Sequence, residues 1–193
     1  MTKFESAISK IDEYNKKDPN IVSDNGKKIQ KEYLDSLRQS NWLTKIDSNP
    51  REELKIAVRS QHIGRWEIPR DSYPETRPGY LNWRSDLSKF HAETTAKILE
   101  EVGYDPLFIE RVKNLNLKRG IKLDPEAQTL EDVLCLVFLE FHISDFCIQH
   151  SREKVINIIQ KTWKKMGHLG RDHALKLNYN PDVLSILREA LEL

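Results

Sequence analysis

The sequence predicts an all-α protein, and three observations support that prediction. Apolar residues recur every three to four positions along most of the chain, the spacing that places them on one face of a helix. Asn or Asp followed by Pro opens several of these segments, as is common at helix N-termini. No segment shows the alternation of apolar and polar residues that a half-buried strand requires. With 193 residues, of which 38% are hydrophobic, we expect one helical domain over 1–193, with a core bundle over about 30–147 and helices of 151–193 packed on it.

The first part of the chain contains three predicted helices. The first has its apolar face over 4–11 and ends before the turn-like segment 17–20. Segment 21–28 is polar and is expected to be a loop. The second helix covers 33–42. The third begins at Asn49-Pro50, carries two glutamates in its first turn, where carboxylates favour the positive end of the helix dipole, and ends at His62.

Segment 63–80 departs from helical spacing and is expected to be a long Pro/Arg/aromatic loop. Arginines and aromatic residues are interleaved in it and just after it: Arg65, Trp66, Arg70, Tyr73, Arg77, Tyr80, Trp83 and Arg84. Guanidinium groups bind phosphate oxygens, and aromatic faces stack on bases. The loop is therefore a candidate phosphate or base site, with Arg65 and Arg70 as candidate phosphate-binding residues. The alternative is a surface loop whose arginines pair with neighbouring acids.

Helical spacing resumes after this loop. One helix runs from Leu81 to a stop at Gly103, and the next begins at Asp105-Pro106. A further helix begins at Asp124-Pro125 and is apolar on nearly every side over 130–147, which is typical of a buried central helix. Three amphipathic segments are expected to pack around it: 155–166, 171–177 and 181–191.

Composition excludes several classes of protein. The 31 Lys and Arg residues balance 30 Asp and Glu residues, so no overall field attracts polyanions, and any contact with RNA needs a local patch. Cys135 and Cys147 form no Cys-x-x-Cys pair, which argues against a disulfide framework or a zinc knuckle and favours a reducing compartment. No apolar run reaches the about 18 residues of a spanning helix. We expect a cytoplasmic protein that does not enter a membrane, with its oligomeric state left open.

Three parts of the sequence resemble the HD metal-dependent phosphohydrolase superfamily. Segment 61–66 is similar to its His-Asp-Ile-Gly-Lys/Arg element, with Gln61 where the superfamily has His and His62 where it has Asp. The helix that contains His91 looks like the one that begins with a ligand histidine and ends at a glycine. Segment 124–132 is similar to the part that delivers the last metal ligand, an aspartate, which falls on Asp132.

The resemblance implies that His62, His91 and Asp132 hold a divalent ion (Mn, Fe, Co, Mg or Zn) and leave coordination positions open for water or substrate. Two further histidines that it implies are absent: Asp35 is the nearest polar residue to one position, and Lys118-Arg119 occupies the other. Each proposed ligand also has a structural interpretation, because Asp132 favours the N-terminal end of its helix and His91 can be a satisfied core residue.

A closer resemblance covers nearly the full chain. The sequence is similar to the DUF4202 family of bacteria and fungi, for which no activity is established. The similar runs are 4–12, 61–63, 65–70, 79–84 and 124–133.

The expected function is that of a metal-dependent hydrolase of the HD-like class, acting on a phosphorylated small molecule or nucleotide. In this reading the metal ion lowers the pKa of a bound water, while Arg65 and Arg70 bind the phosphate. One alternative is a non-catalytic nucleotide- or RNA-binding module with a degenerate HD-like site. Another is a non-haem iron oxygenase on the same fold, since His and carboxylate ligands also suit iron.

Overall fold

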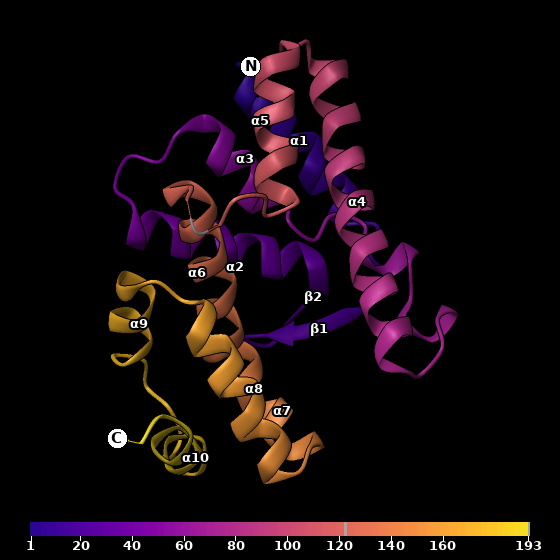
Figure 1. The fold of residues 1–193 in the computed structure, drawn as a ribbon. Coiled ribbons are helices and arrows are strands. Elements are labelled where there is room, and N and C mark those ends of the chain that lie inside the picture. The colour runs from indigo at the N-terminus through magenta and orange to yellow at the C-terminus, as the bar shows by residue number, and fades with distance from the viewer. Residues whose placement is uncertain (122, 193) are drawn as a thin grey trace. The chain divides into compact units, whose positions relative to one another are not determined.

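The computed structural model describes residues 1–121 and 123–192 and confirms the all-α prediction (Figure 1). The helices are α1 (Lys3–Asn15), α2 (Lys31–Ile46), α3 (Glu52–Ser60), α4 (Arg77–Val102), α5 (Pro106–Asn116), α6 (Pro125–Val137), α7 (Ile143–Gln149), α8 (Arg152–Lys165), α9 (His168–Ala174) and α10 (Pro181–Leu191). The chain forms two compact units, Met1–Gly120 and Ile121–Leu193. Their boundary falls inside the predicted core of 30–147, and one domain over 1–193 stays a prediction.

The first unit is built from α1 to α5. Helix α5 packs against both α3 and α4, which run beside it in Figure 1, and α1 contacts α3 and α4. Fully buried apolar side chains from these helices and from the turn after α3 form its core: Ile11, Leu43, Leu54, Ile56, Ile63, Leu99 and Leu115. One ion pair joins α1 to α3, because both carboxylate oxygens of Asp12 accept hydrogen bonds of 2.7 Å from the Arg59 guanidinium.

A β-hairpin replaces the loop expected over 21–28. Strands β1 (Ile21–Asp24) and β2 (Lys27–Gln30) pair in antiparallel fashion across the two-residue turn Asn25-Gly26. Both turn residues have positive φ, 49° and 78°, which is the geometry that Asn-Gly adopts in tight hairpins. The expectation of a loop was wrong because each strand has only four residues and is rich in polar side chains, although Asn-Gly itself signals a hairpin.

The Pro/Arg/aromatic loop is shorter than expected. Residues 65–67 and 70–72 form 3-10 turns, and α4 then begins at Arg77 rather than near Leu81. Thr76 caps this helix by accepting a hydrogen bond from the Gly79 amide. Pro78 lies in the first turn, where a missing N–H costs nothing, so it opens the helix instead of preventing it.

The second unit contains α6 to α10, and buried residues of α7, α8 and α10 form one cluster of its core. Most residues of α6, in the segment that the sequence predicted to be buried, have little exposed surface. A π-helical turn (Phe138–His142) joins α6 to α7, and α6 contacts α8 and α9. Leu130, Leu136 and Ile143 are fully buried. Burial is incomplete further along this segment, because Glu140 and Asp145 are exposed and the Phe141 side chain is 37% exposed. Within the part of the chain that the structure describes, no helix is long and apolar enough to cross a membrane.

Candidate functional site

A pocket of about 320 Å³ lies within the first unit. Three segments that are distant in sequence form it: the turn after α3, one face of α4, and the residue that follows the end of α5. The lining residues are Gln61, His62, Arg65, Leu81, Arg84, Ser85, Leu87, Ser88, His91 and Lys118. Those from α4 recur mostly every three to four positions, so a single face of that helix provides one wall.

The turn after α3 brings His62 close to His91. The centroids of the two imidazole rings lie 6.0 Å apart. Gly64 allows the chain to reverse here, because its φ of 65° lies in the left-handed region that favours glycine. The rings of Phe90 and Tyr14 cover this glycine so closely that a Cβ atom would lie 2.7 Å and 2.9 Å from their carbon atoms.

His91 presents an unprotonated ring nitrogen. Its Nδ1 lies 2.7 Å from the carbonyl oxygen of Ile63. Because a carbonyl only accepts hydrogen bonds, Nδ1 carries the proton, and Nε2 of the neutral ring is left with a lone pair. Nε2 is buried and has no hydrogen-bond partner. Burial, with a smaller contribution from Arg65 and Arg84, lowers the pKa of His91 to about 4, so the imidazole is neutral at pH 7.

His62 is held from the side of α2. Its Nδ1 lies 3.3 Å from Gln39 Nε2 and 4.0 Å from Glu32 Oε2. Burial is the main cause that lowers its pKa well below the ordinary value, and the cations around the pocket act in the same direction. His62 is therefore also neutral at pH 7. Its side chain remains 28% exposed.

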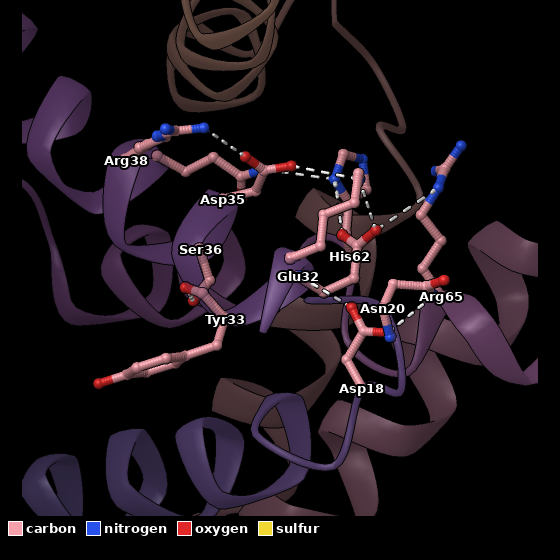
Figure 2. A network of polar contacts seen from close by, with 11 residues as sticks. Asp18, Asn20, Glu32, Tyr33, Asp35, Ser36, Arg38, His62 and Arg65 are labelled. Atoms are coloured by element: carbon pink, nitrogen blue, oxygen red, sulfur yellow. Dashed lines mark hydrogen bonds and ion pairs between the residues drawn. The ribbon is translucent and has the colours of Figure 1, made fainter. Parts of the chain in front are cut away.

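Glu32 is a buried carboxylate between the histidine and an arginine, as Figure 2 shows. Its oxygens lie 4.0 Å from His62 Nδ1 and 4.0 Å from Arg65 Nε, and Lys31 Nζ lies 3.1 Å away. Its backbone N–H donates to Asp18, which fixes the start of α2. Burial raises the pKa of Glu32, and the neighbouring cations partly oppose that effect.

Cationic side chains make the pocket attractive to anions. Arg65, Arg84 and Lys118 are among its lining residues. The Arg65 guanidinium lies 5.2 Å from the centroid of the Trp83 ring, which supports it on one side. Lys118 follows the end of α5 with a φ of 55°, an uncommon conformation for a residue with a side chain. The resemblance to HD enzymes implies a histidine near this position.

Gln61 contributes a second unpaired acceptor. Its Nε2 donates to the carbonyl oxygen of Asn116, and this contact fixes the orientation of the amide. Gln61 Oε1 is buried and has no hydrogen-bond partner. Asn116 is itself held by the hydroxyls of Ser60 and Thr95, so α3, α4 and α5 together support Gln61.

Asp132, the third predicted ligand, belongs to the second unit. Its Oδ1 accepts hydrogen bonds from Gln128 Nε2 at 2.9 Å and from the Gly167 amide at 2.7 Å. Gly170 packs so closely that a Cβ atom there would lie 2.6 Å from Asp132 Cγ. Burial raises the pKa of this carboxyl group. Within its unit the side chain secures the turn that leads into α9.

The other residues of the Pro/Arg/aromatic loop are engaged with the protein itself. Arg70 does not line the pocket, because its guanidinium donates to the carbonyl oxygens of Tyr73 and Pro74. The Tyr73 hydroxyl donates to Asp86, and the Trp83 indole donates to the Ile68 carbonyl. Of the two predicted phosphate-binding arginines, Arg65 is in the pocket and Arg70 is not.

The structure adds residues that the sequence did not single out as part of the site. Glu32 and Gln39 approach His62 from α2, and Lys118 lines the pocket after α5. Among residues 1–121 and 123–192, no group of three or more His, Cys, Asp and Glu side chains is arranged to hold a metal ion. The predicted set of His62, His91 and Asp132 stays a prediction.

The comparisons with known proteins identify the family. The model of the family described as "Domain of unknown function (DUF4202)" matches residues 5–187. The searches of the curated proteins and of the solved structures found no significant match. Because the family match covers nearly all of the sequence, the chain belongs to the DUF4202 family.

Proposed function

We propose that this protein binds a phosphorylated small molecule or nucleotide in the pocket between α3, α4 and the end of α5, and hydrolyses its phosphate group. The observation that carries the proposal is the combination of two neutral imidazoles with three cationic side chains in one pocket. Cations bind phosphate oxygens and stabilise the charge that develops during transfer, and a neutral imidazole offers a lone pair to a metal ion or to a proton of water.

Arg65, Arg84 and Lys118 are the phosphate-binding residues in this proposal. Arg65 is the best placed of them to act as a fixed fork, because Trp83 and Glu32 hold its guanidinium. Arg70, which the sequence analysis assigned to the same task, is left out because its donors are used by backbone carbonyls.

The two imidazoles are the candidate ligands for a divalent ion in this pocket. His91 Nε2 suits a metal ion, being buried, unprotonated and without a partner. Among the residues that the structure describes, no group of three or more His, Cys, Asp and Glu side chains is arranged to hold a metal ion, although the Glu32 carboxylate lies 4.0 Å from His62. We therefore derive no catalytic step through a metal ion and leave metal dependence to the experiment.

A specific observation also favours a second candidate, a non-catalytic module that binds the same ligands. Gln61 and Lys118 occupy positions at which the resemblance to HD enzymes implies histidines, and both line the pocket. An amide and a cation there retain the ability to bind a phosphate ester but provide fewer metal ligands.

Metal analysis and a turnover screen test the proposal. Untagged protein is assayed for release of inorganic phosphate from phosphomonoesters and nucleotides with Mn, Co, Mg, Zn or Fe. We expect turnover, and we expect Arg65→Ala with Arg84→Ala to lower kcat/KM about 100-fold, since each charge-assisted bond contributes at least about 1.5 kcal/mol. Arg70→Ala is the matched control and should leave kcat/KM unchanged. Ligand binding without turnover would favour the second candidate, and absence of phosphate binding would contradict both.

A further inference from the structure

Two residues that line the pocket carry hydrogen-bond acceptors without donors. Gln61 Oε1 and His91 Nε2 are both buried and unpartnered, and both residues line the same cavity. Neither a flip of the Gln61 amide nor the other tautomer of His91 can remove these unpaired acceptors. The carbonyl of Asn116 requires the Gln61 NH₂ on its side, and the carbonyl of Ile63 requires the proton on His91 Nδ1.

Such a pair of acceptors calls for donors in the ligand. A buried acceptor without a hydrogen bond is costly, and most buried polar groups in folded proteins have a partner. A hydroxyl group supplies a donor without bringing a charge. The same pocket already carries Arg65, Arg84 and Lys118, which repel a cationic donor such as an ammonium group.

The remaining lining residues distinguish between kinds of phosphate ester. The side chains that line the pocket, all of them in the described part of the chain, include no Phe, Tyr or Trp on which a base could stack. The nearby Trp83 is only 8% exposed, and its indole N–H is bonded to the Ile68 carbonyl. Instead α4 presents the hydroxyls of Ser85 and Ser88.

We infer that the ligand of this pocket is the phosphate monoester of a small polyol or sugar rather than a nucleotide. Its hydroxyl groups donate hydrogen bonds to Gln61 and His91, while its phosphate lies against the cationic side chains. The inference rests on the proposed function and makes it specific, because it names the class of molecule esterified to the phosphate.

The test depends on two ligands that differ only in hydroxyl groups, glycerol 1-phosphate and propyl phosphate, with two further ligands for comparison. Binding of glycerol 1-phosphate, propyl phosphate, inorganic phosphate and adenosine monophosphate is measured by titration calorimetry on the full chain. We expect glycerol 1-phosphate to bind about 20-fold more tightly than propyl phosphate, because two hydrogen bonds each contribute about fivefold. Adenosine monophosphate should bind more weakly than glycerol 1-phosphate.

The near-isosteric variant Gln61→Met should lower this preference to about fivefold and leave the affinity for propyl phosphate unchanged. Gln149→Met, an exposed position in the second unit, is the control. Since the ligand comparison needs no substitution, the test stands even where the variant fails to fold.

Three results would overturn the inference. One is equal affinity for propyl and glycerol phosphates, with inorganic phosphate still bound, which would leave the proposed function intact. Another is tighter binding of adenosine monophosphate. A third is binding of Mn²⁺ or Zn²⁺ by the ligand-free protein that His91→Asn abolishes, since the His91 lone pair would then belong to a metal. Failure of inorganic phosphate and of all three esters to bind would overturn the proposed function itself.

Discussion

The neutral, buried state of His91 should make the stability of the first unit depend on pH in a way that one substitution removes. His91→Asn is the informative change, because the Asn side-chain NH₂ can replace Nδ1–H as the donor to the Ile63 carbonyl but does not titrate. The pKa of His91 is about 4 in the folded protein, against an ordinary value of 6.5 in the unfolded chain.

The unfolded state therefore binds a proton first as the pH falls. Above both pKa values, His91 is neutral in the folded and the unfolded protein and contributes no pH dependence to the free energy of unfolding. Stability is lost as the pH drops below 6.5, and the loss is complete below 4. The free energy of unfolding should fall by about 2 kcal/mol between about pH 7.5 and about pH 5 through this residue alone, and by about 3 kcal/mol once the loss is complete.

Urea unfolding followed by tryptophan fluorescence measures this effect, because Trp42, Trp66 and Trp83 belong to the first unit. Other groups also titrate in this range, so the informative quantity is the difference between the wild-type protein and His91→Asn at each pH. Gln149→Asn, at an exposed position that does not titrate, should retain the full wild-type slope. Identical slopes for the wild type and His91→Asn would refute the assignment of a buried neutral imidazole.

Three further substitutions, with Gly26→Ala as the control for the first, test the local geometry by urea unfolding, and for Lys118 also by phosphate binding. Gly64→Ala should lower the free energy of unfolding by about 2 to 4 kcal/mol, since the new side chain meets both a strained φ and a steric clash. Gly26→Ala, with a positive φ but open space around it, should lower it by only about 1 kcal/mol. Equal losses for the two variants would contradict the packing over Gly64. Lys118→Gly should raise the free energy of unfolding by about 0.5 to 1 kcal/mol, because glycine adopts the positive φ without strain. The same substitution should weaken phosphate binding about tenfold. Unchanged phosphate binding would exclude this lysine from the site. Gly170→Ala should lower the free energy of unfolding by about 1 to 3 kcal/mol, because the added Cβ atom clashes with Asp132. An unchanged free energy of unfolding would show that this carboxylate is not held against α9.

Much of the helical framework could be predicted because helix signals are local. Asp105 and Asp124 each cap the helix that they precede by accepting backbone hydrogen bonds, and Gly103 ends α4 with a φ of 86°. The local signals failed where two interpretations competed. Asn25-Gly26 lies in a segment predicted to be a loop although it forms a hairpin turn. Pro78 lies in the predicted Pro/Arg/aromatic loop of 63–80 although it stands in the first turn of α4.

The site could be predicted only in part, because it depends on which segments pack together. His62 and His91 were singled out through a family resemblance, and they share one pocket. Lys118 could not be assigned, since its place in the pocket follows from the packing of α5 on α3 and α4. Glu32 lies just before the helix that the sequence predicts over 33–42, and only the fold shows that it is buried beside His62.

The central claim, that the pocket of His62 and His91 binds a phosphate group, is tested most directly by an anomalous difference map from crystals soaked in tungstate, a heavy-atom analogue of phosphate. We predict one strong tungsten peak within hydrogen-bond distance of the side chains of Arg65, Arg84 and Lys118, and its loss in crystals of Arg65→Ala with Arg84→Ala. A map with no peak in this pocket, or with tungsten bound only at Arg70 or elsewhere on the surface, would contradict the claim.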